Sequence, residues 1–159
     1  PTENDPFFRK QLVHGYVHDE GAALFGGISG NAGLFSNAND MAKIYQMWLN
    51  EGEYGGERFL SKETVRLFTT TKSSVSRRGL GFDKPDPQNP KASPCGKKTP
   101  SSVYGHTGFT GTCFWVDPEN QLIYIFLSNR VYPSRTPNKL SSMEIRERIQ
   151  DEIYSAFIK

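Results

Sequence analysis

The amino-acid sequence predicts a single α+β unit, in which two helices precede a three-stranded antiparallel sheet and a C-terminal helix covers that sheet. Three observations support this prediction. Apolar residues recur at helical spacing in three separate segments. Two short apolar runs rich in β-formers are joined by strong turn residues. The order of helices, then hairpin, then helix is typical of α+β proteins.

The first helix is predicted to follow the candidate caps Asn39 and Asp40. Apolar residues then fall at i, i+3, i+4, i+7 and i+8, which places them on one face of a helix. Gly52 ends the pattern. The stripe comprises Met41, Ile44, Tyr45, Trp48 and Leu49.

Two further helices are predicted from the same periodicity. A short one follows Ser61 and points Val65 and Phe68 inward. The last begins at a Ser141-x-x-Glu144 capping box and runs to Phe157. Its apolar face needs a sheet or another helix to lie on.

The strands are predicted between these helices. Residues 122–127 form an unbroken apolar run, which favours a strand buried on both faces. Residues 112–116 form its hairpin partner, and the Asp-Pro-Glu-Asn segment 117–120 is the turn between them. Residues 101–106 are predicted to add a third strand.

The composition is that of a globular protein and excludes several functional classes. The chain has 159 residues, 19 basic and 17 acidic side chains, and a net charge of +2. This balance argues against disorder and against a nucleic-acid-binding protein. The apolar run at 122–127 is far too short to span a membrane. Residues 83–100 carry five prolines and are predicted to form a long surface loop.

The two cysteines, Cys95 and Cys113, can form at most one disulfide, and their spacing is not that of a metal site. Two interpretations stay open. They are free thiols, with Cys113 buried in a strand, or they pair in an oxidising compartment.

The segment Gly105-His106-Thr107-Gly108-Phe109 is the first candidate for chemistry. Strand alternation directs His106 and residue 108 to the same face, and Gly108 leaves that face open to a substrate backbone. The amide of Phe109 then points at a developing oxyanion. The alternative is a glycine-rich hairpin with a surface histidine.

A weaker candidate is a metal site formed by His14, His18 and Asp19, because histidines four residues apart share a helix face. Gly15 and the β-branched Val13 argue against a helix there. A loop histidine and aspartate making structural hydrogen bonds is the preferred interpretation, and we predict no metal and no cofactor.

His106-Thr107-Gly108 resembles the third motif of the penicillin-recognising serine hydrolases, the group of serine β-lactamases, DD-peptidases and related esterases. The match extends through 105–112, 115–118 and 125–130, and upstream through 17–19, 26–36 and 78–83. The triplet alone is a weak signal, whereas the ordered set of blocks is a strong one.

Two elements of that family's chemistry are absent from the sequence. No serine is followed by lysine at the third position, and no tyrosine is followed by asparagine at the second. Because these motifs precede the third one in the family's order, the resemblance implies that residues 1–159 are a C-terminal portion of such a hydrolase domain. Its partners would then be the N-terminal part of the same hydrolase and a small-molecule or peptide substrate.

The resemblance implies a β-lactamase- or DD-peptidase-like fold and hydrolysis of an amide or ester through an acyl-enzyme, on a β-lactam or a D-Ala-type cell-wall substrate. His106 would take the catalytic-motif lysine position, and Thr107, Gly108 and Phe109 would bind substrate and oxyanion. The chain alone is predicted to be inactive. The alternative is a non-catalytic binding or scaffold domain of the same fold.

The resemblance favours a bacterial periplasmic, envelope or secreted location. It also implies a sheet edge left open in this chain, at which we expect a homo-oligomer.

Overall fold

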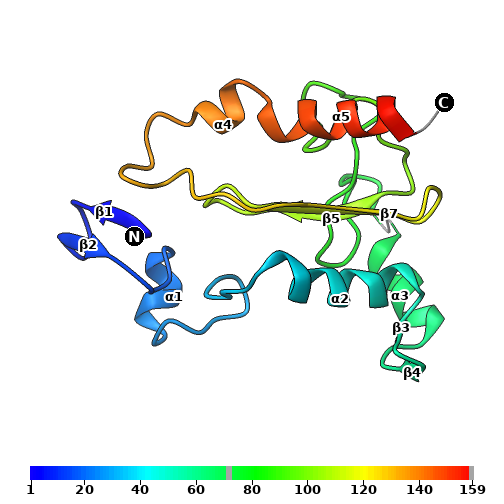
Figure 1. The fold of residues 1–159 in the computed structure, drawn as a ribbon, viewed down its shortest axis with the longest axis horizontal. Coiled ribbons are helices and arrows are strands. Elements are labelled where there is room, and N and C mark those ends of the chain that lie inside the picture. Colours follow the sequence, from blue (N-terminus) through cyan, green and yellow to red (C-terminus); the bar gives the residue numbers. More distant parts are fainter. Residues whose placement is uncertain (71–72, 158–159) are drawn as a thin grey trace.

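In the computed structural model, which describes residues 1–70 and 73–157, a central antiparallel sheet lies between two helical layers (Figure 1). The sheet has the strand order β5-β6-β7, with β5 at Tyr104–Thr107, β6 at Cys113–Asp117 and β7 at Leu122–Phe126. Helix α5, Ile145–Phe157, covers one face, and helix α2, Ala38–Leu49, covers the other. The predicted α+β architecture is therefore confirmed.

Smaller elements surround this framework. Strands β1, Glu3–Asp5, and β2, Gln11–Val13, form an N-terminal hairpin beside helix α1, Glu20–Leu24. Strands β3, Glu53–Tyr54, and β4, Glu57–Arg58, form a second hairpin before helix α3, Lys62–Thr69. Helix α4, Lys139–Ser142, precedes α5. None of the described helices is long and apolar enough to cross a membrane.

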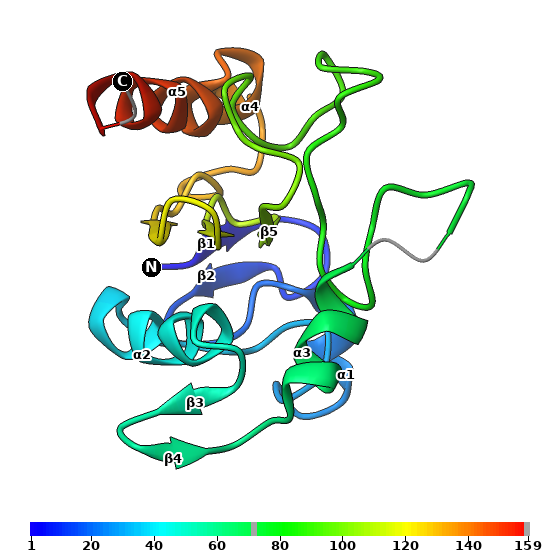
Figure 2. The same ribbon diagram turned by 90° about the vertical axis from the view of Figure 1, so that its right-hand side faces the viewer.

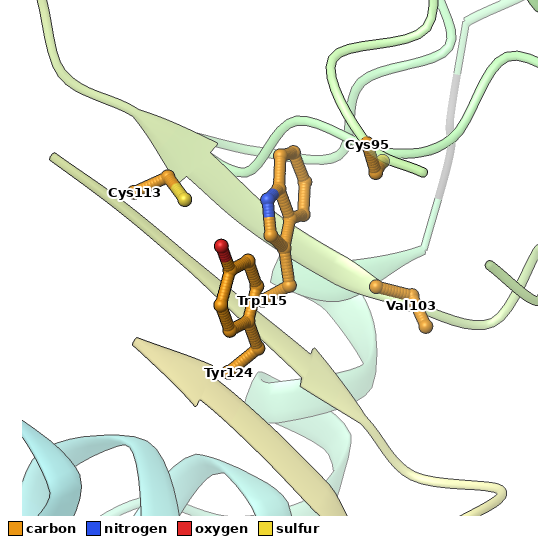
Figure 3. Packing of buried hydrophobic residues seen from close by; sticks show 5 residues of the cluster. All are labelled: Cys95, Val103, Cys113, Trp115 and Tyr124. Atoms are coloured by element: carbon orange, nitrogen blue, oxygen red, sulfur yellow. The ribbon is translucent and has the colours of Figure 1, made fainter. Parts of the chain in front are cut away.

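The register of the sheet assigns each apolar side chain to one of two cores. Tyr104, Val116, Phe114, Ile123 and Ile125 face α2, where they pack with Tyr45 and Leu49. Strand residues in between face α5, because successive side chains point to opposite faces. This second core contains Cys95, Val103, Cys113, Trp115 and Tyr124, with Phe126 and Ile153 packed against it (Figure 3).

Both cysteines lie in this α5-side core, in which Figure 3 shows the Trp115 ring between them. They are free thiols, 2% and 3% exposed, and they do not form a disulfide in the structure. Of the two alternatives left open by the sequence, the structure therefore has the free thiols, with Cys113 in strand β6.

Two predicted helix starts are wrong. Helix α2 begins earlier than predicted, because Asn37 is its N-cap and its side chain accepts a hydrogen bond from the Asp40 amide at 3.0 Å. The capping box at Ser141 and Glu144 does not form. Ser141 lies inside α4, whose cap is Asn138, and Glu144 has φ of 49°, which separates α4 from α5.

The predicted strands are confirmed with two adjustments. The third strand begins at Tyr104 because Val103 closes a turn onto Pro100, with its amide donating at 3.2 Å. Strand β7 is covered on both faces, but only Tyr124 within it is fully buried, because its outer edge is open. Within the predicted loop 83–100, Asp83 makes an isolated bridge to Gly105 and Gly96 donates to Gln150 of α5.

Candidate functional site

The candidate site is built on the free edge of strand β5. Gly105 exchanges two hydrogen bonds with Asp83, so its amide and carbonyl point away from β6. Because the backbone groups of residues two apart point to the same edge of a strand, the amide of Thr107 points away from β6 as well. Beyond the Asp83 bridge this edge has no further strand partner among the described residues. The Thr107 amide is therefore available to an extended ligand.

Gly108 closes the tight turn that follows the strand. Its amide donates to Thr112 O at 2.7 Å, and its carbonyl accepts from the Gly111 amide at 3.0 Å. A Cβ at residue 108 would collide with Thr112 Oγ1, and Gly111 has φ of 115°, in the region that favours glycine. The geometry thus requires both glycines, but the space that a side chain at residue 108 would need is filled by Thr112 and is not left open to a substrate backbone as predicted.

Phe109 is contacted by Arg130 and by His18. Its carbonyl accepts a hydrogen bond from Arg130 Nε at 2.7 Å, and the Arg130 guanidinium lies 4.3 Å from the centroid of its ring. The centroids of the His18 and Phe109 rings are 5.3 Å apart. The Phe109 amide donates to no acceptor among the residues that the structure describes. It is a second free backbone donor beside that of Thr107.

His106 belongs to the α2 face of the sheet, because it pairs in register with Phe114, whose ring stacks on Tyr45 at 3.9 Å between centroids. Its Nδ1 lies 2.7 Å from Thr107 O. A carbonyl oxygen only accepts hydrogen bonds, so Nδ1 is the donor in this contact and the neutral ring keeps Nε2 as an acceptor. The residue is half-buried, within reach of a ligand on that face.

All four residues predicted from the sequence line one cleft of about 1260 Å³. Its walls come from the turn after β5, the N-terminal hairpin region, the loop before α2, and α2 itself. Apolar wall residues are Leu34, Phe35, Met41, Tyr45, Phe114, Ile125 and Leu127, and polar ones include His18, Glu20, Asn129 and Arg135. The cleft therefore combines apolar side chains with polar and charged groups that could orient a ligand.

A buried ionic network lies beside the cleft, whose lining includes its members Arg135 and Glu20. Glu3 is 1% exposed and accepts hydrogen bonds from Arg135 Nε at 2.6 Å and Nη2 at 2.7 Å. Arg135 also donates to Glu20 at 3.0 Å. The hydrogen bonds from Arg135 lower the pKa of Glu3 against the opposing effect of burial. The carboxylate of Glu3 is thus kept ionised.

His18 lies against this network. Its Nε2 is 3.0 Å from Glu3 Oε2, within ion-pair distance but misaligned for a hydrogen bond. Burial lowers the pKa of His18, although the nearby Glu3 carboxylate opposes that effect. Arg9 donates hydrogen bonds to the carbonyls of Val17, His18 and Asp19, and these bonds fix the backbone around His18.

The metal site considered for His14, His18 and Asp19 does not form. The Asp19 side chain caps α1 by accepting from the Ala22 amide at 2.7 Å, and His18 faces Glu3 instead. Within residues 1–70 and 73–157, no group of three His, Cys, Asp or Glu side chains is placed to hold a metal ion.

Glu3, Arg130 and Arg135 were not predicted from the sequence. Glu3 and Arg135 pair with each other across 132 residues, and Arg130 lies beyond the end of β7. No local pattern identifies these three residues, because each is a single charged residue between two uncharged ones. Only Arg130 falls in a segment, 125–130, that already resembled a known family.

Comparisons with known proteins agree on one family. The family model described as "Beta-lactamase" matches residues 2–144. A protein of Escherichia coli K12 named "Putative D-alanyl-D-alanine carboxypeptidase" is 36% identical over 162 residues, covering 95% of this chain and 37% of its own length. A Salmonella typhi protein of the same name is 38% identical, covering 84% of this chain and 32% of its own length.

The fold has a match among solved structures as well. The crystal structure of a beta-lactamase from Mycobacterium bovis superposes with a TM-score of 0.61 at 18% sequence identity. The match covers 80% of this chain and 47% of that one, and it shows a shared fold. The chain spans about a third of the length of the curated relatives it matches.

Proposed function

The chain belongs to the beta-lactamase family, and we propose that it forms the substrate-facing part of a serine hydrolase that cleaves an amide or ester through an acyl-enzyme. Relatives named as D-alanyl-D-alanine carboxypeptidases support a β-lactam or a D-Ala-type cell-wall peptide as substrate. In this proposal the chain contributes the substrate-binding strand, and the rest of a longer protein contributes the nucleophile.

The observation that carries the proposal is the open edge of β5 beside the cleft. The free amides of Thr107 and Phe109 flank Gly108 in the turn that ends the strand. Two free N–H donors at the end of a strand are suited to a substrate carbonyl that gains negative charge during acyl transfer. Backbone donors on a rigid sheet need little reorganisation for this purpose.

His106 would act at the position where relatives of this type carry a lysine or a histidine. With Nδ1 turned to Thr107 O, the neutral ring offers Nε2 to a substrate hydroxyl or amide as an acceptor. When protonated, the same nitrogen becomes a donor to a carboxylate. A histidine here therefore suits acidic as well as neutral substrates.

The nucleophile is expected from outside residues 1–159. The sequence contains no Ser-x-x-Lys and no Tyr-x-Asn, and the relatives extend over nearly three times the matched length. A general base and an activated serine are both required for acylation. The 159-residue chain is accordingly expected to bind substrate without turning it over.

Incubation with a chromogenic β-lactam and an activated ester tests the missing nucleophile. We expect no turnover above the blank and no mass increase of the protein. A serine adduct found by mass spectrometry would contradict the proposed division of labour between this chain and the rest of the hydrolase.

Binding by the β5 edge is tested separately, with a D-alanyl-D-alanine peptide as the probe and amide chemical shifts as the readout. The Thr107 and Phe109 amides should move on titration. Thr107→Pro, which removes only an outward-facing N–H, should weaken binding about two- to tenfold, the contribution of one hydrogen bond. Thr107→Val keeps the amide and the side-chain shape, and serves as the control.

The two tests separate the proposal from its alternative. A peptide that moves neither amide would refute substrate binding at this edge. Binding by the chain, combined with a longer gene product that also lacks Ser-x-x-Lys, would favour a non-catalytic binding domain of the same fold.

A further inference from the structure

The tight turn at residues 108–111 is fixed through its carbonyl groups, all of which accept hydrogen bonds. Gly108 O accepts from the Gly111 amide at 3.0 Å. The other donors belong to the segment 128–130, which follows β7: Ser128 Oγ donates to Gly111 O at 2.9 Å, the Arg130 amide to Thr110 O at 2.8 Å, and Arg130 Nε to Phe109 O at 2.7 Å. This segment therefore holds the turn that carries the free Phe109 amide.

The Arg130 side chain binds the carbonyl of the same residue whose amide is free. Its Nε donates to Phe109 O, its Nη1 donates to Arg135 O at 2.9 Å, and its guanidinium lies over the Phe109 ring at 4.3 Å from the centroid. Because the donors of a planar guanidinium point in fixed directions, contacts with two carbonyls leave it little freedom to rotate. Phe109 is thus anchored through its carbonyl and its ring, which fixes the direction of its amide.

The support for the turn comes from outside the cleft. Phe109 and Thr110 belong to the lining of the cleft, and Arg130 does not. Arg146 of α5 supports the end of the turn, since its Nη1 donates to Thr112 O at 3.2 Å. Figure 2 shows α5 on one side of the sheet and α2, which contributes to the cleft, on the other. The Arg130 guanidinium therefore acts on the site without occupying the space of a ligand.

Arg130 carries a positive charge without a counter-ion. Its neighbours Arg135 and Arg146 each have a carboxylate partner, whereas Arg130 has none in the part of the chain that the structure describes. Burial and these two cations lower the pKa of Arg130, although a guanidinium still stays protonated. A clamp on a carbonyl needs only a neutral donor, so the unpaired charge is an added cost. Such a charge is useful beside a site at which negative charge develops.

We propose that Arg130 is a positioning residue of the hydrolase, whose guanidinium holds Phe109 so that the Phe109 amide is directed at the substrate carbonyl. Its unpaired charge favours the negative charge that this carbonyl gains. Arg130 acts through Phe109 and does not touch the substrate. This inference rests on the proposed function, because the Phe109 amide receives a substrate carbonyl only there. Lysine at residue 130 would keep the charge but not the fork of donors.

The first test titrates the 159-residue chain with a D-alanyl-D-alanine peptide and follows the amide chemical shifts. Arg130→Ala should bind the peptide about two- to tenfold more weakly than the parent chain, the contribution of one hydrogen bond. At equal saturation the Thr107 amide should still move, whereas the movement of the Phe109 amide should shrink. Arg148→Ala removes an exposed arginine of α5 and is the matched control. Equal movement of both amides in Arg130→Ala and in the parent overturns the proposal.

The second test asks what restores binding. The ethylguanidinium ion, added at millimolar concentration, should recover the affinity and the Phe109 movement in Arg130→Ala, and should leave the parent and Arg148→Ala unchanged. Arg130→Lys should stay close to Arg130→Ala, because an ammonium lacks the fork. Full affinity in the lysine variant would show that charge alone suffices and overturns the positioning role.

Folding of each variant is checked by urea unfolding. If Arg130→Ala does not fold, the comparison of the parent with Arg130→Lys decides. Unfolding of both variants would make Arg130 a structural support only and overturns the proposal. A parent chain in which the peptide moves neither amide refutes the proposed function and this inference with it. A parent chain that binds, with variants that bind equally well, refutes this inference alone.

Discussion

Arg135→Ala is expected to leave a buried carboxylate without its partner. Glu3 is 1% exposed, and both of its oxygens accept hydrogen bonds from the Arg135 guanidinium, at 2.6 and 2.7 Å. Removal of one member of a buried ion pair costs about 3–5 kcal/mol, because the remaining charge has lost its compensation. Arg135 is 24% exposed, which places the expected loss near the lower end, at about 3 kcal/mol. This is a large fraction of the stability of a typical domain, about 5–15 kcal/mol.

The pKa of Glu3 determines how the loss of stability should change with pH. In the parent chain Arg135 lowers the pKa of Glu3, so the stabilisation is present above the ordinary value of 4.5 and is lost as the pH falls. In the variant the hydrogen bonds from Arg135 are gone, and burial, opposed only by the nearby His18, raises the pKa of Glu3. The ionised carboxylate then lowers the free energy of unfolding at neutral pH, and protonation removes this penalty. The difference in the free energy of unfolding between variant and parent should therefore become smaller as the pH falls.

Urea unfolding followed by circular dichroism, near neutral pH and near pH 4.5, provides the measurement. Lys43→Ala, which removes an exposed pair with Asp40, is the matched control and should leave the free energy of unfolding almost unchanged. Glu3→Gln combined with Arg135→Ala should recover much of the loss, since the buried carboxylate at residue 3 is then gone. A loss that is equal at both pH values, or no recovery in the double variant, would refute the reasoning.

Three further predictions concern the sheet, the thiols and the histidine beside the cleft. Gly105→Ala would place a Cβ against the Phe114 carbonyl and 2.7 Å from the Trp115 ring. Thermal or urea unfolding should show that it lowers the free energy of unfolding by more than about 2 kcal/mol. Gly30→Ala is the control and should leave the free energy of unfolding unchanged, because residue 30 has open space around it. Burial raises the pKa of Cys95 and Cys113 to about 12. Because the thiolate is the reactive form, Ellman's reagent should label neither thiol until the chain is unfolded. Rapid labelling of the folded chain would contradict this prediction. Because burial lowers the pKa of His18, stability should fall as the pH drops below its ordinary value of 6.5, and His18→Gln should flatten that slope in urea titrations.

Local patterns predicted the framework of the fold because they are properties of neighbouring residues. Helical periodicity located α2, α3 and α5, and the apolar runs around the Asp-Pro-Glu-Asn turn located the β6–β7 hairpin. The wrong predictions concern the starts of helices, where neighbouring polar residues compete for the N-cap position. Asn37 and Asn39 are both good caps, and only the packing of Tyr45 and Leu49 against the sheet selects the first.

The short elements were missed for a different reason. The β3–β4 hairpin turns at Gly55 and Gly56, both with positive φ, and a Gly-Gly pair between polar residues is a signal that could have been used. The β1–β2 hairpin has no such signal. It is held by Asp5, whose carboxylate accepts from the amides of Phe7, Phe8 and Arg9, a pattern typical of many surface loops.

By itself the sequence determined the α+β order of elements and the glycine-rich segment from Gly105 to Thr112, because strand alternation and glycine geometry are local. Tertiary structure alone decided that this segment borders a cleft with the N-terminal hairpin and that Arg130 and His18 hold Phe109. It also decided that Glu3 pairs with Arg135 across 132 residues. Such contacts depend on how the chain packs on itself, and the energies that fix them, burial and charge pairing over long sequence separations, leave no periodic trace in the order of the residues.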